Sequence, residues 1–279
     1  MPGGILYVVA TPIGNLEDIT LRALRVLREV DLIAAEDTRH TRVLLSRHGI
    51  SRPLTSYYDA VERARAPAIV EKLKAGARVA LVSDAGTPGI ADPGYHLVRG
   101  ALAAGVPVVP VPGPSAVMAL VSVAGLAAER FVFEGFLPSR PGPRAERLAA
   151  LAREPRAIVF FEAGRRLAAF LAAAHAALGE REAAVARELT KRHEEVLRGT
   201  LAEIAERVAA MGRVRGEVTI LVGARATPET PAATADLDAR IRAARAAGRR
   251  LADLAAEIAR ETGVPRRTVY RRALALERG

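Results

Sequence analysis

Apolar runs alternate with amphipathic helical runs over the first half of the chain, and this alternation limits the possible folds more than any other feature. Strands are expected at residues 5–10, 31–36, 78–84 and 106–111. Helices are expected at residues 19–30, 38–48, 60–75 and 95–104. Strands that are apolar throughout and separated by helices are typical of a parallel sheet covered on both faces.

A second α/β unit is expected to begin near residue 114. Its strands are predicted at residues 131–136, 157–162, 183–190 and 217–222. Its helices are predicted at residues 115–124, 144–152, 166–178 and 201–210, with a Pro-rich loop or lid at residues 137–143. The predicted domains are therefore a parallel α/β domain at 1–113 and a second α/β domain at 114–225, followed by a polar linker at 226–236.

Residues 237–279 are predicted to form a basic, helix-turn-helix-like module. Eleven arginines and four acidic residues give residues 240–279 a charge of +7, out of +10 for the whole chain. A basic module on a nearly balanced body indicates a polyanionic partner, most often nucleic acid. The candidate phosphate contacts are Arg266, Arg267, Arg271 and Arg272 on the last helix. A solvated basic face in an arginine-rich chain is the alternative.

Four loops follow the first four expected strands, at residues 11–16, 36–41, 83–94 and 112–116. Ligands of open α/β sheets bind beyond the carboxyl ends of the strands, so these loops are expected to line one cleft. Asp84 ends a buried strand and is expected to face that cleft. Asp92 precedes Pro93, and this pair is typical of a helix N-cap with proline at the first helical position.

Several ligand classes are disfavoured by what the sequence lacks. It contains neither G-x-G-x-x-G nor a Walker motif, and carboxylates in the cleft loops repel phosphate but suit amines, hydroxyls and a sulfonium cation. It has no cysteine, and its histidines lack metal-ligand spacing, so no metal is expected. We see no signal peptide and no apolar run of membrane-spanning length, which together favour the cytoplasm over a membrane.

Six motifs, in order along the chain, resemble one family. They are YVVATPIGNLEDIT at residues 7–20, AEDTRHT at 35–41, SDAGTPGIADPG at 83–94, PGPS at 112–115, EGFLP at 134–138 and ARELTK at 186–191. Together they resemble the bacterial small-subunit ribosomal RNA cytidine 2′-O-methyltransferases, a branch of the tetrapyrrole methylase fold family. The resemblance covers nearly the whole chain, including the basic helices.

The resemblance implies two α/β domains that hold S-adenosylmethionine (SAM) in a cleft between them, commonly in a homodimer. It implies small-subunit ribosomal RNA, or the assembled small ribosomal subunit, as the partner. The implied SAM contacts are Ile13, Asp84, Gly86, Thr87, Ile90, Ser115, Ala116, Phe161, Leu189 and Val218.

Lys191 is the leading catalytic candidate, because a ribose hydroxyl needs a base or a polarising cation before it can attack a methyl group. It is one of only three lysines and is expected at a strand end, where arginine cannot replace a group that must lose a proton. A simple phosphate contact is the alternative. Glu36 and Asp37 are rival bases that could instead pair with Arg42 or with Arg39, itself a candidate RNA contact.

Two other functions remain open at this point. A tetrapyrrole C-methyltransferase would share the fold, although a macrocyclic substrate does not require a basic helical module. A regulator with a ligand-sensing body and a DNA-binding tail would also account for the module.

Overall fold

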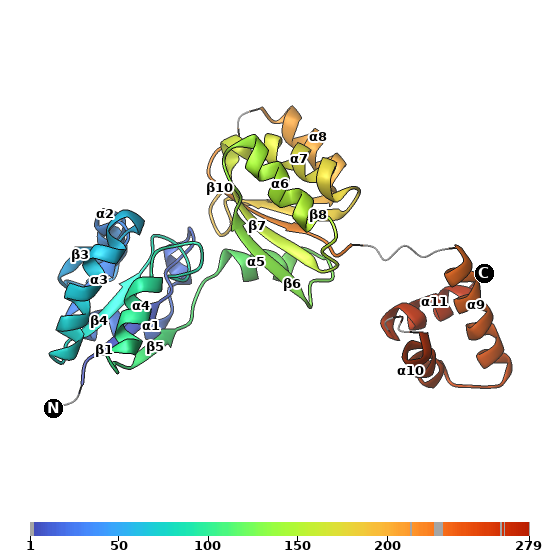
Figure 1. Ribbon diagram of the computed structural model, residues 1–279, viewed down its shortest axis with the longest axis horizontal. Coiled ribbons are helices and arrows are strands. Elements are labelled where there is room, and N and C mark those ends of the chain that lie inside the picture. The colour runs from blue at the N-terminus through green and yellow to red at the C-terminus, as the bar shows by residue number, and fades with distance from the viewer. Residues whose placement is uncertain (1–2, 213, 226–230, 263, 265, 279) are drawn as a thin grey trace. The chain divides into compact units, whose positions relative to one another are not determined.

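A computed structural model describes residues 3–212, 214–225, 231–262, 264 and 266–278 (Figure 1). The chain divides into two compact units, Met1–Arg225 and Ala226–Gly279. The first unit contains two β-sheets with their covering helices, and the second is helical. Among the described residues, no helix combines the length and the apolar character needed to cross a membrane.

The first sheet confirms the predicted parallel arrangement. Its strands are β1 (Ile5–Val9), β2 (Leu32–Ala35), β3 (Leu54–Ser56), β4 (Arg78–Val82) and β5 (Val108–Val111). They lie in the order β3-β2-β4-β1-β5, and all pairs are parallel. The edge strand β3 was not predicted, because its three half-buried residues are too few to show a periodic pattern.

Helices cover both faces of this sheet, as predicted. Successive residues of β4 point to opposite faces: Val79 and Leu81 to one, Ala80 and Val82 to the other. On the face of Ala80 lie α1 (Leu21–Glu29) and α2 (Thr38–Arg47), preceded in the chain by the short helix η1 (Leu16–Asp18). On the face of Val79 lie α3 (Asp59–Lys74) and α4 (Tyr95–Ala103).

The start of α4 differs from the prediction. Its N-cap residue is Gly94 rather than Asp92. Gly94 has a φ of 157°, and a Cβ there would lie 3.2 Å from Leu81 Cδ2, so a side chain would be both strained and crowded. The backbone N–H of Gly94 donates to Glu62 Oε2 at 2.9 Å. The expected capping role of Asp92 is therefore wrong, and its carboxyl group is left for another use.

The second sheet is mixed. Its strands are β6 (Phe131–Phe136), β7 (Ala157–Ala163), β8 (Glu182–Arg187), β9 (Glu195–Thr200) and β10 (Glu217–Val222). In the order β6-β7-β10-β8-β9, only the first pair is parallel. Strand β9 was not predicted, because its half-exposed residues lack a clear apolar alternation. Strand β8 ends three residues before the expected position 190.

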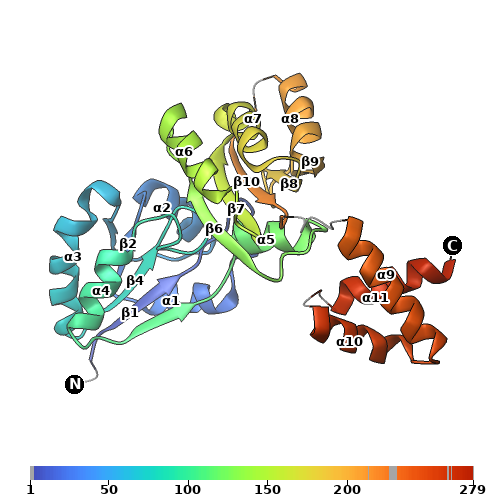
Figure 2. The same ribbon diagram turned by 45° about the vertical axis from the view of Figure 1, so that its right-hand side comes forward.

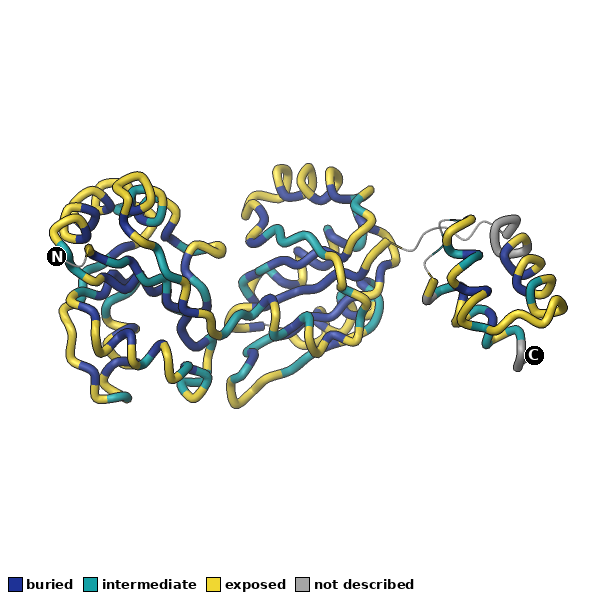
Figure 3. Tube along the Cα trace, turned by 90° about the horizontal axis from the view of Figure 1, so that it is seen from below, coloured by how far each residue is buried: buried dark blue, intermediate teal, exposed yellow. Residues whose placement is uncertain are grey.

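Helices cover both faces of the second sheet as well. One face carries α5 (Ala116–Val123), and the other carries α6 (Pro141–Leu151), α7 (Leu167–Leu178) and α8 (Leu201–Ala210) (Figure 1). Figure 3 shows that the strands are mostly buried, whereas the outer turns of the helices are exposed. The expected Pro-rich loop at 137–143 is shorter than predicted, because Pro141 begins α6, a position that suits proline's fixed φ.

In the second unit, the described residues form three helices that pack on one another (Figure 2). They are α9 (Pro231–Ala246), α10 (Leu251–Thr262) and α11 (Arg266–Arg278). Their shared core includes Ile241 from α9, Leu254 and Ile258 from α10, and Val269 from α11. Helix α9 begins at Pro231, so residues 231–236 are helical rather than part of the expected linker.

Gly164 lies in close contact with the backbone segment just before β10. It begins the short helix η2 (Gly164–Arg166) after β7, and its N–H donates to the Gly216 carbonyl at 2.7 Å. A Cβ at this position would lie 2.9 Å from the backbone of Arg215. We therefore expect Gly164→Ala to lower the free energy of unfolding by about 1–3 kcal/mol, measured by urea denaturation.

Gly142 in α6 is the matched control, because a Cβ there meets nothing within 4 Å. Gly142→Ala is expected to leave stability unchanged or slightly raised. Equal effects of the two substitutions would contradict the proposed backbone contact.

Candidate active site

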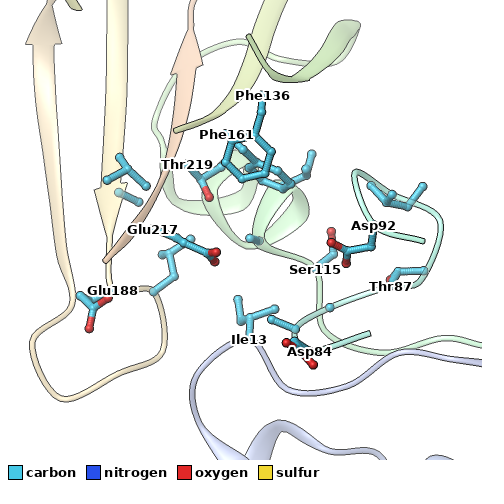
Figure 4. A pocket seen from close by; sticks show the side chains of 18 of the residues that line it. Ile13, Asp84, Thr87, Asp92, Ser115, Phe136, Phe161, Glu188, Glu217 and Thr219 are labelled. Atoms are coloured by element: carbon cyan, nitrogen blue, oxygen red, sulfur yellow. The ribbon is translucent and has the colours of Figure 1, made fainter. Parts of the chain in front are cut away.

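A pocket of about 200 Å³ lies where the loops after β1, β4 and β5 meet the ends of β7, β8 and β10 (Figure 4). All ten residues expected to contact SAM line it. They are Ile13, Asp84, Gly86, Thr87, Ile90, Ser115, Ala116, Phe161, Leu189 and Val218. The sequence motifs, although far apart in the chain, therefore converge on one site.

The loops after β1 and β4 are joined by an isolated antiparallel bridge between Thr11 and Gly86. The Thr11 N–H donates to the Gly86 carbonyl at 2.8 Å, and the Gly86 N–H donates back at 3.0 Å. The Thr11 hydroxyl also donates to the Ser83 carbonyl at 3.0 Å. Gly86 has a φ of 81°, which favours glycine, and Ile13 packs beside it.

Acidic side chains dominate the charge of the pocket. The carboxyl groups that line it belong to Glu36, Asp84, Asp92, Glu188 and Glu217, against the single lysine Lys191. Figure 4 shows Glu188 and Glu217 on one side of the pocket, and Asp84 and Asp92 on the other. Among the described residues, no group of three or more His, Cys, Asp or Glu side chains is placed to hold a metal ion. The pocket therefore favours an organic cation and disfavours phosphate.

Asp84 connects the ends of β4 and β2 through hydrogen bonds. Its Oδ1 accepts a hydrogen bond from the Asp37 N–H at 2.9 Å, and its own N–H donates to Glu36 Oε2 at 3.2 Å. Burial raises the pKa of Glu36, and the negative charge of Asp84 raises it further, against the lowering effect of that hydrogen bond. Glu36 is thus a carboxyl group with an elevated proton affinity in the pocket wall.

Asp92 lines the pocket as well, which the sequence did not predict. Burial raises its pKa to about 7, the charge of Glu36 adds to the shift, and a hydrogen bond with Ser83 opposes it. Gly94, not Asp92, caps α4. The position of Asp92 in a cleft loop is the sequence signal that could have identified it as a pocket residue. Asp92 therefore changes charge in the physiological pH range.

Lys191 lines the pocket but does not end a strand. It lies in the turn after β8, where its Nζ donates to Glu188 Oε1 at 3.0 Å. Glu188 and Thr190 have φ values of 54° and 64°, a backbone conformation that is rare for residues other than glycine. The stem of Lys191 lies against Gly14, where a Cβ would approach Lys191 Cγ to 2.5 Å. A strained turn and a bare glycine thus position this lysine.

Asp37 does not line the pocket. It is the N-cap of α2, where its Oδ1 accepts from the Arg39 N–H at 2.8 Å. The Arg39 guanidinium donates to both carboxylate oxygens, which holds the pKa of Asp37 well below its usual range. Asp37 thus pairs with Arg39, which is the alternative that the sequence left open. This pairing makes Asp37 a poor candidate for a general base.

Aromatic and small side chains form the rest of the wall. Phe161 packs against Phe136 with ring centroids 5.5 Å apart, and both line the pocket together with Thr219 (Figure 4). The Ser115 hydroxyl accepts from the Met118 N–H and caps α5. Lining residues that sequence analysis did not select are Ala85, Asp92, Val117, Phe136, Ala186, Glu188, Glu217 and Thr219.

The arginines expected to contact RNA from α11 differ in their environments. The Nε and Nη2 atoms of Arg272 donate to the two carboxylate oxygens of Asp238 on α9, each at 2.7 Å. This pairing lowers the pKa of Asp238. Arg272 is therefore held by an ion pair within the module, and its role as a phosphate contact stays a prediction. Arg266 donates to the Ala252 carbonyl at 3.2 Å, and Arg271 is exposed. The side chain of Arg267 lies outside the described residues.

Comparison with known proteins assigns the family. The profile of the family described as Tetrapyrrole (Corrin/Porphyrin) Methylases matches residues 5–205, well over half of the chain. The protein is a tetrapyrrole methylase family member. Within that family it groups with proteins named ribosomal RNA small subunit methyltransferase I. The one from Mesorhizobium japonicum is 47% identical over 274 residues, covering 98% of this chain and 92% of that protein.

The same name recurs for a protein from a second organism. The protein from Synechocystis sp. is 46% identical over 277 residues, covering 98% of this chain and 99% of that protein. Among solved structures, diphthine synthase has a TM-score of 0.61 at 16% identity, covering 80% of this chain and 90% of its own. Uroporphyrin-III-C-methyltransferase from Thermus thermophilus has a TM-score of 0.56 at 22% identity, with coverages of 79% and 94%. These structures share the tetrapyrrole methylase fold.

The raised pKa of Asp92 predicts a pH-dependent stability difference. The unfolded chain ionises this group near pH 3.8, whereas the folded protein keeps it neutral up to about pH 7. Wild-type protein therefore loses stability as pH rises through this window. We expect the stability advantage of Asp92→Asn over wild type to grow by about 1 kcal/mol between pH 5 and pH 8, after discounting for solvent screening. Urea denaturation at several pH values measures it, and a pH-independent difference would contradict it.

Proposed function

We propose that the protein transfers a methyl group from SAM to the 2′-hydroxyl of a cytidine in small-subunit ribosomal RNA. The observation that carries this proposal is the acidic, partly aromatic pocket built from the six motifs. The names of the full-length relatives support the RNA substrate. The cytidine and the 2′ position are supported by the resemblance of those motifs. We place the reaction in the cytoplasm, where ribosomal subunits are assembled.

The pocket residues fit SAM. Asp84, Glu217 and the other carboxylates suit its sulfonium and ammonium charges, and Gly86 lets a ligand approach the backbone closely. Phe161 and Leu189 offer apolar surface for a flat base. When bound, SAM supplies a methyl group activated by its attachment to a positively charged sulfur. The protein's main contribution to an in-line transfer is alignment of the attacking oxygen with that methyl group.

Lys191 is the residue we assign to the ribose hydroxyl. Its side chain lines the pocket, and its ion pair with Glu188 restricts where the ammonium group can point. An ammonium held in this way donates to the hydroxyl oxygen and fixes its direction, and the adjoining carboxylate is placed to accept the proton that leaves. Glu36, with its raised pKa, is a second proton acceptor in the same pocket.

The basic second unit is proposed to contact RNA outside the pocket. Arg271 and Arg266 are exposed on α11, and Arg39 is exposed at the start of α2. Exposed guanidinium groups bind phosphate oxygens without reading sequence, which suits a module that adds affinity. The partner is small-subunit ribosomal RNA, either alone or within the assembled small subunit.

A homodimer is the proposed assembly. Helix α5 exposes Met118 and Val123, which have 58% and 48% of their surface accessible, and Phe136 is also exposed. Large apolar side chains exposed on the surface of a chain favour a protein–protein contact. Analytical ultracentrifugation of the wild type and of Met118→Glu distinguishes a dimer through this surface from a monomer.

Labelled SAM offered with two substrates separates the proposed function from its rivals. Undermethylated small ribosomal subunits should accept label at a ribose, whereas free tetrapyrrole should not. Label on the tetrapyrrole would support a C-methyltransferase. Label on neither, together with selective binding of duplex DNA, would support a regulator.

Substitution of Lys191 tests the assigned chemistry. We expect Lys191→Ala to lower kcat about 10²-fold or more while the Kd for SAM stays within about twofold of wild type. Lys191→Arg should recover activity only if the residue orients the hydroxyl without releasing a proton, since arginine stays protonated. Single-turnover methylation and calorimetric SAM titration measure both. Unchanged turnover in Lys191→Ala would remove this residue from the mechanism.

Removal of the second unit tests its role in RNA binding. A chain that ends at Arg225, the boundary of the first compact unit, should bind small-subunit RNA about tenfold or more weakly, with a shallower dependence on salt. Arg271→Glu in the full chain should shift both quantities in the same direction. SAM affinity serves as the control and should not change. RNA binding with an unaltered salt slope would rule out the module as an RNA contact.

A further inference from the structure

A groove adjoins the pocket and shares Lys191 with it. Three segments line the groove: the loop at residues 14–17, the end of α2 with Arg47 and His48, and the turn at residues 190–192. The groove is open to solvent along the surface of the first unit. A ligand lying in it would therefore reach the pocket past the Lys191 side chain.

The charge changes sign where the groove meets the pocket. Arg47, Arg192 and Lys191 line the groove against one acidic residue, Glu17, whereas five carboxylates line the pocket. Arg47 and Arg192 are exposed, and neither makes a side-chain hydrogen bond or ion pair within the described part of the chain. Their guanidinium groups differ in this respect from that of Arg39, which is engaged by Asp37. They are available to a ligand with negative charge.

Two polar atoms of groove residues are buried without a hydrogen-bond partner among the described residues, namely His48 Nε2 and Thr190 Oγ1. Buried polar atoms in folded proteins are nearly always paired, either with protein groups or with ordered water. Thr190 is also held at a φ of 64°, which is costly for a β-branched residue. Its N–H donates to Glu194 Oε2 at 2.6 Å, a contact that keeps the turn in this conformation.

We propose that this groove binds the phosphodiester backbone of the RNA strand next to the methylated nucleotide. Arg47 and Arg192 contact phosphate oxygens, and the strand then delivers one ribose past Lys191 to the pocket. The change of sign excludes phosphates from the acidic pocket while the uncharged ribose enters it. This inference rests on the proposed function and extends it to a defined path for the substrate strand.

Charge reversal at the two arginines tests the groove in the full-length protein. Arg47→Glu and Arg192→Glu should each raise the KM for undermethylated small ribosomal subunits about tenfold, while the Kd for SAM stays within about twofold of wild type. Each should also reduce the slope of log K against log salt for a single-stranded RNA oligonucleotide by about 0.7 per lost phosphate contact. The neutral variants Arg47→Gln and Arg192→Gln should show about half of the loss in binding free energy.

Arg153→Glu is the matched control, because Arg153 is exposed and lies just before β7, at the opposite end of that strand from Phe161. It should leave KM and the salt slope close to wild type. Wild-type KM and slope in both groove variants would overturn the inference, as would an equal loss in Arg153→Glu. If wild-type protein methylates no RNA, the proposed function fails instead, and the oligonucleotide titration still tests the groove.

Discussion

The bridge between Thr11 and Gly86 is the interaction on which the site depends. It joins the loops after β1 and β4 by two backbone hydrogen bonds, so the adjacent side chains Ile13 and Asp84 are placed together. Asp84 then links the end of β2 through its contacts with Glu36 and Asp37. Because these contacts depend mainly on backbone atoms, they hold the wall of the pocket whatever ligand occupies it.

Much of the fold could be predicted because it follows from long apolar periods. The strands β1, β2, β4 and β5 and their four covering helices show such periods, and each was predicted to within a few residues. Strand β3 spans only three residues and β9 is half-exposed, so neither has a pattern that separates it from a loop. Their places at the edges of the two sheets are set by tertiary pairing, which local sequence does not encode.

The candidate site was predictable in part of its membership but not in its contacts. Glycine-rich loops after strands identified the wall, yet three assignments depended on which partner each charged group finds. Gly94 displaces Asp92 from the N-cap, Arg39 engages Asp37, and Asp238 engages Arg272. Each of these carboxyl or guanidinium groups has several sequence neighbours with suitable charge, and only the folded chain selects among them.

The acidity of the pocket also affects how the used methyl donor is exchanged for a fresh one. A sulfonium donor carries a positive charge that the surrounding carboxylates attract, whereas the thioether left after methyl transfer carries none at its sulfur. Under the proposed function, the electrostatic attraction between the donor's sulfur and these carboxylates is therefore lost once the methyl group has been transferred. The same side chains that attract the charged donor thus favour its exchange for the by-product.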